Sequence, residues 1–251
     1  MKKLFLISMT ILMSFAVATS AFADNKAILN NEAKYKADVE LIKSKITSVQ
    51  EDTIVYDSIM NSRINQIQAY EQMCNNSSGQ LMAANVIDPK LSCRASLLGG
   101  AGVAQLAGWK HTGNLLTHSL QNNPSTITAN VGNALSTDVQ NSKEMKNIIN
   151  SFKKKLTSSI SYYSENGSVS LTNDKDLYLA LNKVSYLIAA EKVGSTWTIY
   201  TWVNDTYNFE YWNFSSAHSD FVTIVNNYAA FCQATGAVVP YSINIYFQDT
   251  K

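Results

Sequence analysis

The chain has 251 residues, of which 46% are hydrophobic and 16% charged, and its 20 lysines and arginines nearly balance its 19 aspartates and glutamates. The ordinary apolar content excludes a disordered chain, and the low proline and glycine content excludes a collagen-like architecture. The near-neutral charge argues against a nucleic-acid-binding protein, which needs a basic face to neutralise phosphates. The length fits a globular protein of one or two domains.

The first 23 residues have the three parts of a secretory signal peptide. Lys2 and Lys3 give a positive start, Leu4–Val17 is apolar, and Ala21–Ala23 is a small-residue cleavage site before Asp24. We therefore expect cleavage after residue 23 and a periplasmic or secreted mature protein. The leader is short for a membrane span, and no later stretch has the roughly 18 uninterrupted apolar residues that predict a transmembrane helix.

Export changes the interpretation of the three cysteines, because disulfides form in oxidising compartments. Cys74 and Cys93 are close in sequence and are the expected pair, closing a loop of about 20 residues that contributes up to about 3 kcal/mol. Cys232 would then remain a buried thiol. All three single-bridge pairings stay open, and no Cys-x-x-Cys spacing supports a metal site.

The apolar periodicity predicts three long helices in the first part of the mature chain. They extend over 26–73, over 126–164, where Glu165-Asn166-Gly167 would end the helix, and over about 173–194. Asn173 would cap the start of the third helix and Gly194 its end.

Two features lie between the first two of these helices. Asp88-Pro89 predicts a turn. Ala95–Trp109 carries no charge and contains four glycines, which would allow a close approach of backbones at a cost in helix propensity.

The C-terminal region is aromatic, since 14 of the 26 aromatic residues lie between Trp197 and Phe247. The expected elements are strands over 196–203 and 207–214 with a turn at Asn204-Asp205, a helix over 217–234, and a strand over 241–247. The apolar face of that helix would contain Phe221, Ile224, Val225, Tyr228 and Cys232.

The predicted fold class is mainly α, within α+β. A helical bundle with long N-terminal and central helices would occupy 24–194, and an aromatic-rich subdomain over 195–251, with a small antiparallel β-sheet and one helix, would pack on it. An all-α fold, with the strands as extended tails, is the alternative.

The common catalytic motifs are absent from the sequence. There is no Gly-x-Ser-x-Gly elbow and no His-Glu-x-x-His helix, and the glycines near residue 100 do not complete a nucleotide-binding loop. A hydrolase using His118 and His218 is an alternative that depends on geometry. No cofactor and no metal are predicted.

The aromatic region supplies the candidate ligand-binding residues, which are Trp197, Trp202, Tyr207, Tyr211 and Trp212. Exposed aromatic rings beside asparagine and threonine can stack on sugar rings or contact the apolar patch of a partner. The competing interpretation places these rings in the core.

A second candidate surface would contact a membrane. Its residues are Leu97, Leu98, Val103, Leu106 and Trp109 of the apolar segment, with the lysine run Lys153, Lys154 and Lys155 facing anionic head groups. A lysine run is also typical of a solvated helix face, and the apolar segment is shorter than the roughly 20 residues of a standard span.

The sequence therefore favours an exported bacterial protein that binds a protein or glycan partner outside the cytoplasm and is not an enzyme. We expect it to be virulence-associated and to bind no nucleic acid. The alternatives are a membrane-active or pore-forming protein that uses 95–109 on an anionic membrane surface, and the secreted hydrolase.

Overall fold

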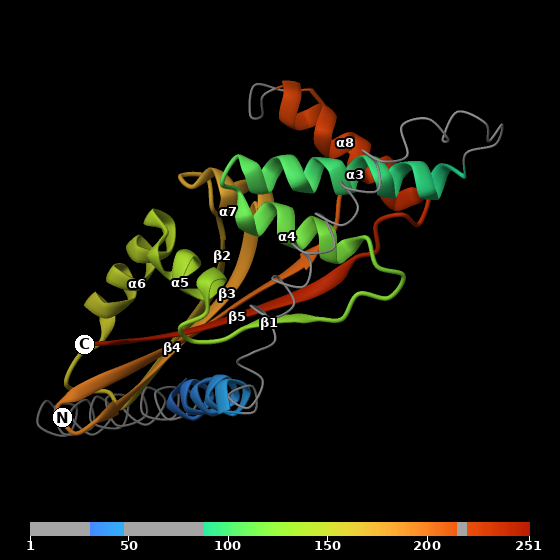
Figure 1. Cartoon of the computed structure of the whole chain (residues 1–251). Helices are drawn as coiled ribbons and strands as arrows, with labels where there is room; N and C mark the ends of the chain where they lie inside the picture. Colours follow the sequence, from blue (N-terminus) through green and yellow to red (C-terminus); the bar gives the residue numbers. More distant parts are fainter. Residues whose placement is uncertain (1–30, 48–87, 215–219) are drawn as a thin grey trace, which may run out of the picture.

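The computed structural model describes residues 31–47, 88–214 and 220–251, and these form a five-stranded sheet with helices on both faces (Figure 1). The strand order is β1 (Ile127–Ala129), β5 (Tyr241–Thr250), β4 (Thr196–Tyr207), β3 (Lys183–Val193) and β2 (Tyr162–Ser170). β1 is parallel to β5, and the other neighbours are antiparallel.

The larger core fills one face of this sheet. Alternation along the strands directs Ile188, Ile199 and Ile243 to this face, where they pack with residues of α4, α5, α6 and α7. These helices span Lys110–Ser119, Ala134–Asn141, Lys143–Lys155 and Lys175–Ala180. Figure 1 shows them on the side of the sheet opposite the blue helix over 31–47.

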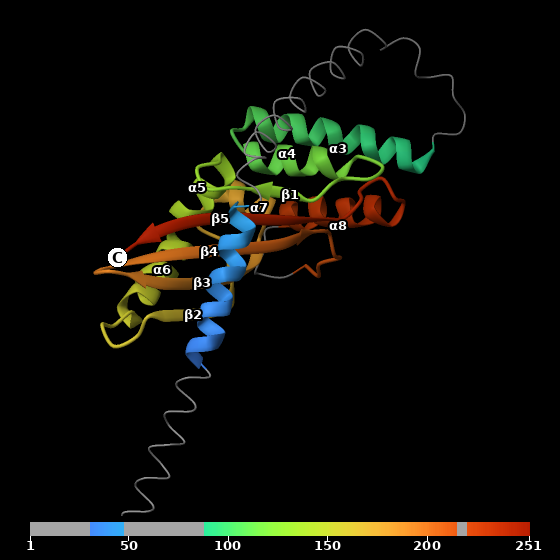
Figure 2. The same cartoon turned by 90° about the horizontal axis from the view of Figure 1, so that it is seen from below.

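On the opposite face, the helix over 31–47 crosses the strands and covers part of the sheet (Figure 2). Val39, Ile42 and Ile46 recur at helical spacing and are buried against Ala189, Tyr200 and Tyr246 of the sheet.

An ion pair anchors this helix from its side. Lys43 lies 3.0 Å from the carboxylate of Glu191 on β3. Tyr200 donates a hydrogen bond of 2.8 Å to the same carboxylate.

A smaller core joins α3 (Pro89–Leu106) to α8 (Asp220–Ala234). It contains Cys93 and Leu97 of α3, Ala229 and Cys232 of α8, and residues 237–238 beyond α8. α3 also packs on α4, where Gly113 allows a close approach: an added Cβ would lie 2.7 Å from the carbonyl oxygen of Ala101.

The predicted helical bundle and its all-α alternative are both wrong, because the described residues are organised around a sheet. The expected helix over 126–164 is divided into β1, α5, α6 and the start of β2. Side-chain caps at Asn133 and Ser142 start the two short helices, and the chain at Leu156 is extended.

The expected helix over 173–194 is also wrong. Six residues form α7, capped by Asp174, and Asn182 with a φ of 52° separates it from β3. Gly194 lies in the two-residue turn between β3 and β4, with a φ of 65°, and not at a helix end. Glu165-Asn166-Gly167, the predicted helix stop, lies within β2.

The Asp88-Pro89 turn is the start of α3, where Asp88 accepts a hydrogen bond from the backbone N–H of Lys90. The strand over 196–203 is confirmed, but it continues to Tyr207 because Asn204 and Asp205 pair with β5. The expected turn at these residues and the strand over 207–214 are therefore wrong.

The predicted helix over 217–234 is confirmed from Asp220 to Ala234 as α8, its first residues lying outside the described ranges, and the predicted strand over 241–247 is confirmed as β5. The expected helix over 26–73 is observed over 31–47, and its other residues lie outside the described ranges. The signal peptide over 1–23 and Cys74 also lie outside them.

Candidate ligand-binding groove

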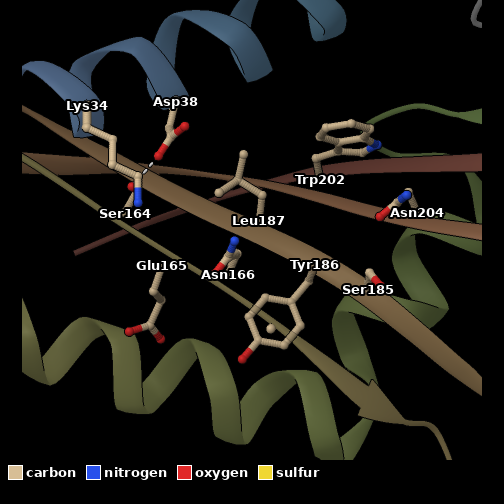
Figure 3. Close-up of a pocket in the computed structure, with 11 residues that line it drawn as sticks. Lys34, Asp38, Ser164, Glu165, Asn166, Ser185, Tyr186, Leu187, Trp202 and Asn204 are labelled. Atoms are coloured by element: carbon tan, nitrogen blue, oxygen red, sulfur yellow. Dashed lines mark hydrogen bonds between the residues drawn. The ribbon is translucent and has the colours of Figure 1, made fainter.

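A cavity of about 480 Å³ opens beside the first turns of helix 31–47, over the part of the sheet face that this helix leaves uncovered (Figure 3). Eight side chains lie around it and define what we call the groove: Lys34, Asp38, Ser164, Asn166, Ser185, Leu187, Trp202 and Asn204. Glu165 and Tyr186 also line the cavity, but Figure 3 shows their side chains on the other side of the strands.

The strand register builds the floor of the groove. Asn166 of β2 is paired with Leu187 of β3, which is paired with Trp202 of β4, so these three form one row across the sheet. Ser185 and Asn204 form the next row. Because side chains two residues apart share a face, both rows project into the groove.

Trp202 is the aromatic residue of the groove, and its position is fixed by neighbours on β5. Its indole N–H donates a 2.9 Å hydrogen bond to Asn244, and its ring lies at 18° to that of Tyr246, with centroids 6.3 Å apart. The indole remains partly exposed. It is therefore an oriented aromatic surface on a rigid sheet.

Polar groups surround this ring. The side chains of Asn166, Ser185 and Asn204 are exposed, and together they offer both hydrogen-bond donors and acceptors. Asp38 accepts a 2.5 Å hydrogen bond from the buried hydroxyl of Ser164, which joins the helix to β2. Lys34 lies one turn before Asp38 and adds a cation to the same rim.

The structure does not bring the five predicted aromatic residues together. Trp197 and Tyr207 are 4% and 5% exposed and belong to the larger core, whereas Trp202 lies on the opposite face of β4. Odd and even positions of one strand face opposite ways, which separates Trp197 from Trp202.

The other two predicted aromatics lie in the segment after β4. Tyr211 is 65% exposed. The backbone of Trp212 is bound by Asn227 of α8, through bonds of 2.7 Å to its N–H and 2.9 Å to its carbonyl oxygen. Neither residue lines the groove.

The predicted membrane residues are likewise divided. Val103 and Leu106 of α3 are 65% and 87% exposed. Leu97 is buried, Leu98 is half-buried, and the ring of Trp109 lies under the ammonium of Lys175, 4.2 Å away. In the described parts of the chain, no helix is both long and apolar enough to cross a membrane.

The lysine run belongs to α6, which Figures 1 and 2 place away from α3. Lys153 pairs with Asp249 at 2.9 Å and Lys155 pairs with Glu165, while Lys154 is exposed. The two halves of the expected membrane surface therefore do not form one patch.

His118, expected in the hydrolase alternative, is buried and packed edge-on against Tyr241. One ring nitrogen lies 2.8 Å from the carbonyl oxygen of Ser125 and the other 2.8 Å from the amide nitrogen of Gln121. These contacts occupy the nitrogens that proton transfer would need. His218 lies outside the described residues.

Sequence reasoning found Trp202 but missed the other groove residues. These residues come from four elements. Strand register brings them together, and the register cannot be derived from the sequence alone. Among the residues that the structure describes, no cluster of three His, Cys, Asp or Glu side chains is placed to hold a metal. No protein-family model matches the chain, and comparisons with curated proteins and with solved structures give no significant match.

Proposed function

We propose that the protein is an exported binding protein that holds a saccharide in the groove. The observation that carries this proposal is the oriented, partly exposed indole of Trp202 beside the exposed amides and hydroxyl of Asn166, Asn204 and Ser185. A pyranose presents C–H groups on its ring faces and hydroxyls at its edge, so an aromatic face and neighbouring amides match it.

The position of the groove supports tight recognition. Its floor consists of side chains on three paired strands, and residues on such elements hold their geometry better than residues on loops. A ligand that enters a preformed site loses less free energy to ordering the protein. The volume of about 480 Å³ is in the range of small-molecule sites.

The same side chains favour binding over catalysis. Asp38 is the carboxylate within the groove as defined, and it accepts the hydrogen bond of Ser164. Glu165 lies behind the strand and pairs with Lys155. Hydrolysis of a glycoside needs two carboxyl groups on either side of the scissile bond, an arrangement that the groove side chains do not offer.

A saccharide array with the chain over 24–251 tests this proposal. We expect selective binding to a subset of saccharides, with Trp202→Ala reducing affinity about tenfold, because an aromatic contact contributes up to about 1.5 kcal/mol and about 1.4 kcal/mol corresponds to a factor of ten. Asn204→Ala should also weaken binding. The matched control is Asn208→Ala, an exposed asparagine just beyond β4, which should bind like the unmodified chain. Unchanged binding by Trp202→Ala, or no saccharide bound, would contradict the proposal.

A second candidate function uses the exposed apolar residues of α3 and α8. They are Leu91, Val103 and Leu106 on α3 and Ile224, Val225, Tyr228 and Phe231 on α8, each at least 39% exposed. Exposed apolar surface of this kind is typical of contacts with a membrane or another protein. Ile224, Val225 and Tyr228 were expected on one apolar face of this helix with Cys232, but they are exposed, and the buried positions beside Cys232 include Thr223, Asn226 and Ala229.

Flotation with neutral and with anionic vesicles tests the membrane form of this second candidate. If these residues insert, the chain should float, and replacing Val103 and Leu106 by serine should abolish flotation without lowering the melting temperature. Leu97 is not a suitable position for this test, because it is buried and its replacement would destabilise the fold. A chain that stays at the bottom of the gradient with both kinds of vesicle would contradict the membrane form of this candidate.

A further inference from the structure

Two cysteines far apart in the sequence meet where α3 packs on α8. Cys93 and Cys232 are 2% and 0% exposed and share a small core with Leu97, Ala229 and Val238. Their side chains are within hydrogen-bonding reach of one another, and the structure carries both as free thiols.

We propose that Cys93 and Cys232 form a disulfide that ties α3 to α8 in the exported protein. The proposal rests on the contact between the two helices and on the oxidising compartment that the leader sequence predicts. It is independent of what the groove binds. Because a sulfur forms one such bond, this pairing replaces the Cys74–Cys93 pair expected from sequence spacing.

The oxidant is a small or protein-borne disulfide, such as oxidised glutathione. One cysteine thiolate attacks that disulfide and expels one of its sulfurs as a thiolate, which leaves a mixed disulfide on the protein. The second cysteine thiolate attacks the protein sulfur of the mixed disulfide, and the other external thiolate leaves. The two protein thiols lose two protons and two electrons, and the external disulfide is reduced to two thiols.

The surroundings of the pair determine when this exchange occurs. Burial, with the neighbouring thiol of Cys93, raises the pKa of Cys232 to about 12, so this thiol is almost wholly protonated at neutral pH once the helices are packed. Because both thiols are also buried, an external disulfide reaches them during folding or on transient separation of α3 and α8. Once formed, it is shielded from reductants by the same core.

The bond would constrain the chain strongly. Cys93 and Cys232 enclose about 140 residues, and a cross-link across a longer loop removes more conformational freedom from the unfolded state. Strands β1 to β4 and helices α4 to α7 all lie between the two positions, and β5 follows Cys232. Stability under reducing and non-reducing conditions should therefore differ clearly.

The test uses the Cys74→Ser variant of the chain over 24–251, refolded in a mixture of reduced and oxidised glutathione. We expect its intact mass to fall by that of two hydrogen atoms, and a non-reducing digest to contain the peptide pair joining positions 93 and 232. The same digest of the unmodified chain should give the same pair. Reduction of the Cys74→Ser variant should lower its melting temperature by several degrees, a comparison within one polypeptide that needs no further variant to fold.

Two results would overturn the proposal. One is a Cys74–Cys93 or Cys74–Cys232 peptide pair as the main cross-link of the unmodified chain. The other is a Cys74→Ser variant that keeps two titratable thiols after refolding in the oxidising mixture. The variants Cys93→Ala and Cys232→Ala, each combined with Cys74→Ser, are the controls and should show no loss of mass.

Discussion

The indole of Trp202 lies nearly parallel to the ring of Tyr246 on the neighbouring strand, 6.3 Å away and at 18°. The two residues are register partners, so strand pairing sets this arrangement. Five residues earlier on the same strand, Trp197 is buried in the core on the opposite face. One strand thus supplies both a structural and a candidate binding tryptophan.

This difference predicts distinct stability effects for the two tryptophans. Trp197→Ala should lower the free energy of unfolding by about 3–5 kcal/mol, because it leaves a large cavity. Trp202→Ala removes a partly exposed ring and should cost no more than about 2 kcal/mol. Urea unfolding of the two variants measures both values, and equal losses would show that Trp202 is also a core residue.

Helix 31–47 forms one wall of the groove, and Ile42 holds it on the sheet. Ile42 is fully buried, so Ile42→Ala should lower the free energy of unfolding by about 2–4 kcal/mol. Its neighbour Leu41 is 41% exposed, and Leu41→Ala should change stability by less than about 1 kcal/mol. If both variants unfolded at the same urea concentration, the assigned face of this helix would be incorrect.

The glycines of the α3–α4 region should respond to alanine in opposite directions. An added Cβ at Gly113 would lie 2.7 Å from the backbone oxygen of Ala101, so Gly113→Ala should destabilise by about 1–2 kcal/mol. At Gly99 or Gly100 of α3 nothing lies within 4 Å, and alanine should stabilise by about 1 kcal/mol through helix propensity. Thermal melts of the three variants test this, and a stabilising Gly113→Ala would disprove the close approach of the two helices.

Asp205 should make stability depend on pH. Burial raises the pKa of its carboxyl from 3.8 to about 7, so the folded chain keeps this proton to a higher pH than the unfolded chain. The contribution of Asp205 to the free energy of unfolding is therefore greatest below about pH 4. It decreases as the pH rises to about 7 and is constant above that, with a total loss of at most about 4 kcal/mol.

The variant Asp205→Asn keeps an acceptor for the N–H of Thr206 and removes the charge. It should match the unmodified chain near pH 4 and exceed it in stability near pH 8. The difference between the two unfolding free energies, measured by urea titration across this range, isolates the titration of Asp205. A difference that does not vary with pH would mean that the carboxyl has its ordinary pKa.

The sequence predicted the elements whose pattern is local. Alternating β-branched and aromatic residues identified β5 and the first part of β4, and helical spacing identified α8 and the helix over 31–47. β3 was missed because its pattern of apolar residues is ambiguous. Leu177, Leu181 and Val184 have helical spacing, yet the chain changes from α7 to β3 among them.

The sequence pattern did not predict β2 for a different reason. Glu165-Asn166-Gly167 is typical of a turn, but pairing with β3 at every position from Tyr162 to Ser170 holds it extended. Such long-range pairing has no local signature. Most groove residues could not be predicted from the sequence for the same reason, because Asn166, Ser185 and Asn204 become neighbours only through strand register.

The measurement that tests the account most directly is a saccharide titration followed by the indole N–H signals in a ¹H–¹⁵N spectrum. The chain has four tryptophans, Trp109, Trp197, Trp202 and Trp212, and a Trp202→Phe variant assigns the signal of interest. Binding in the groove predicts a saturable shift of the Trp202 signal, with the signal of buried Trp197 nearly unchanged. A saccharide that shifts other tryptophans and leaves Trp202 in place, or no saccharide that moves Trp202 at all, would contradict it.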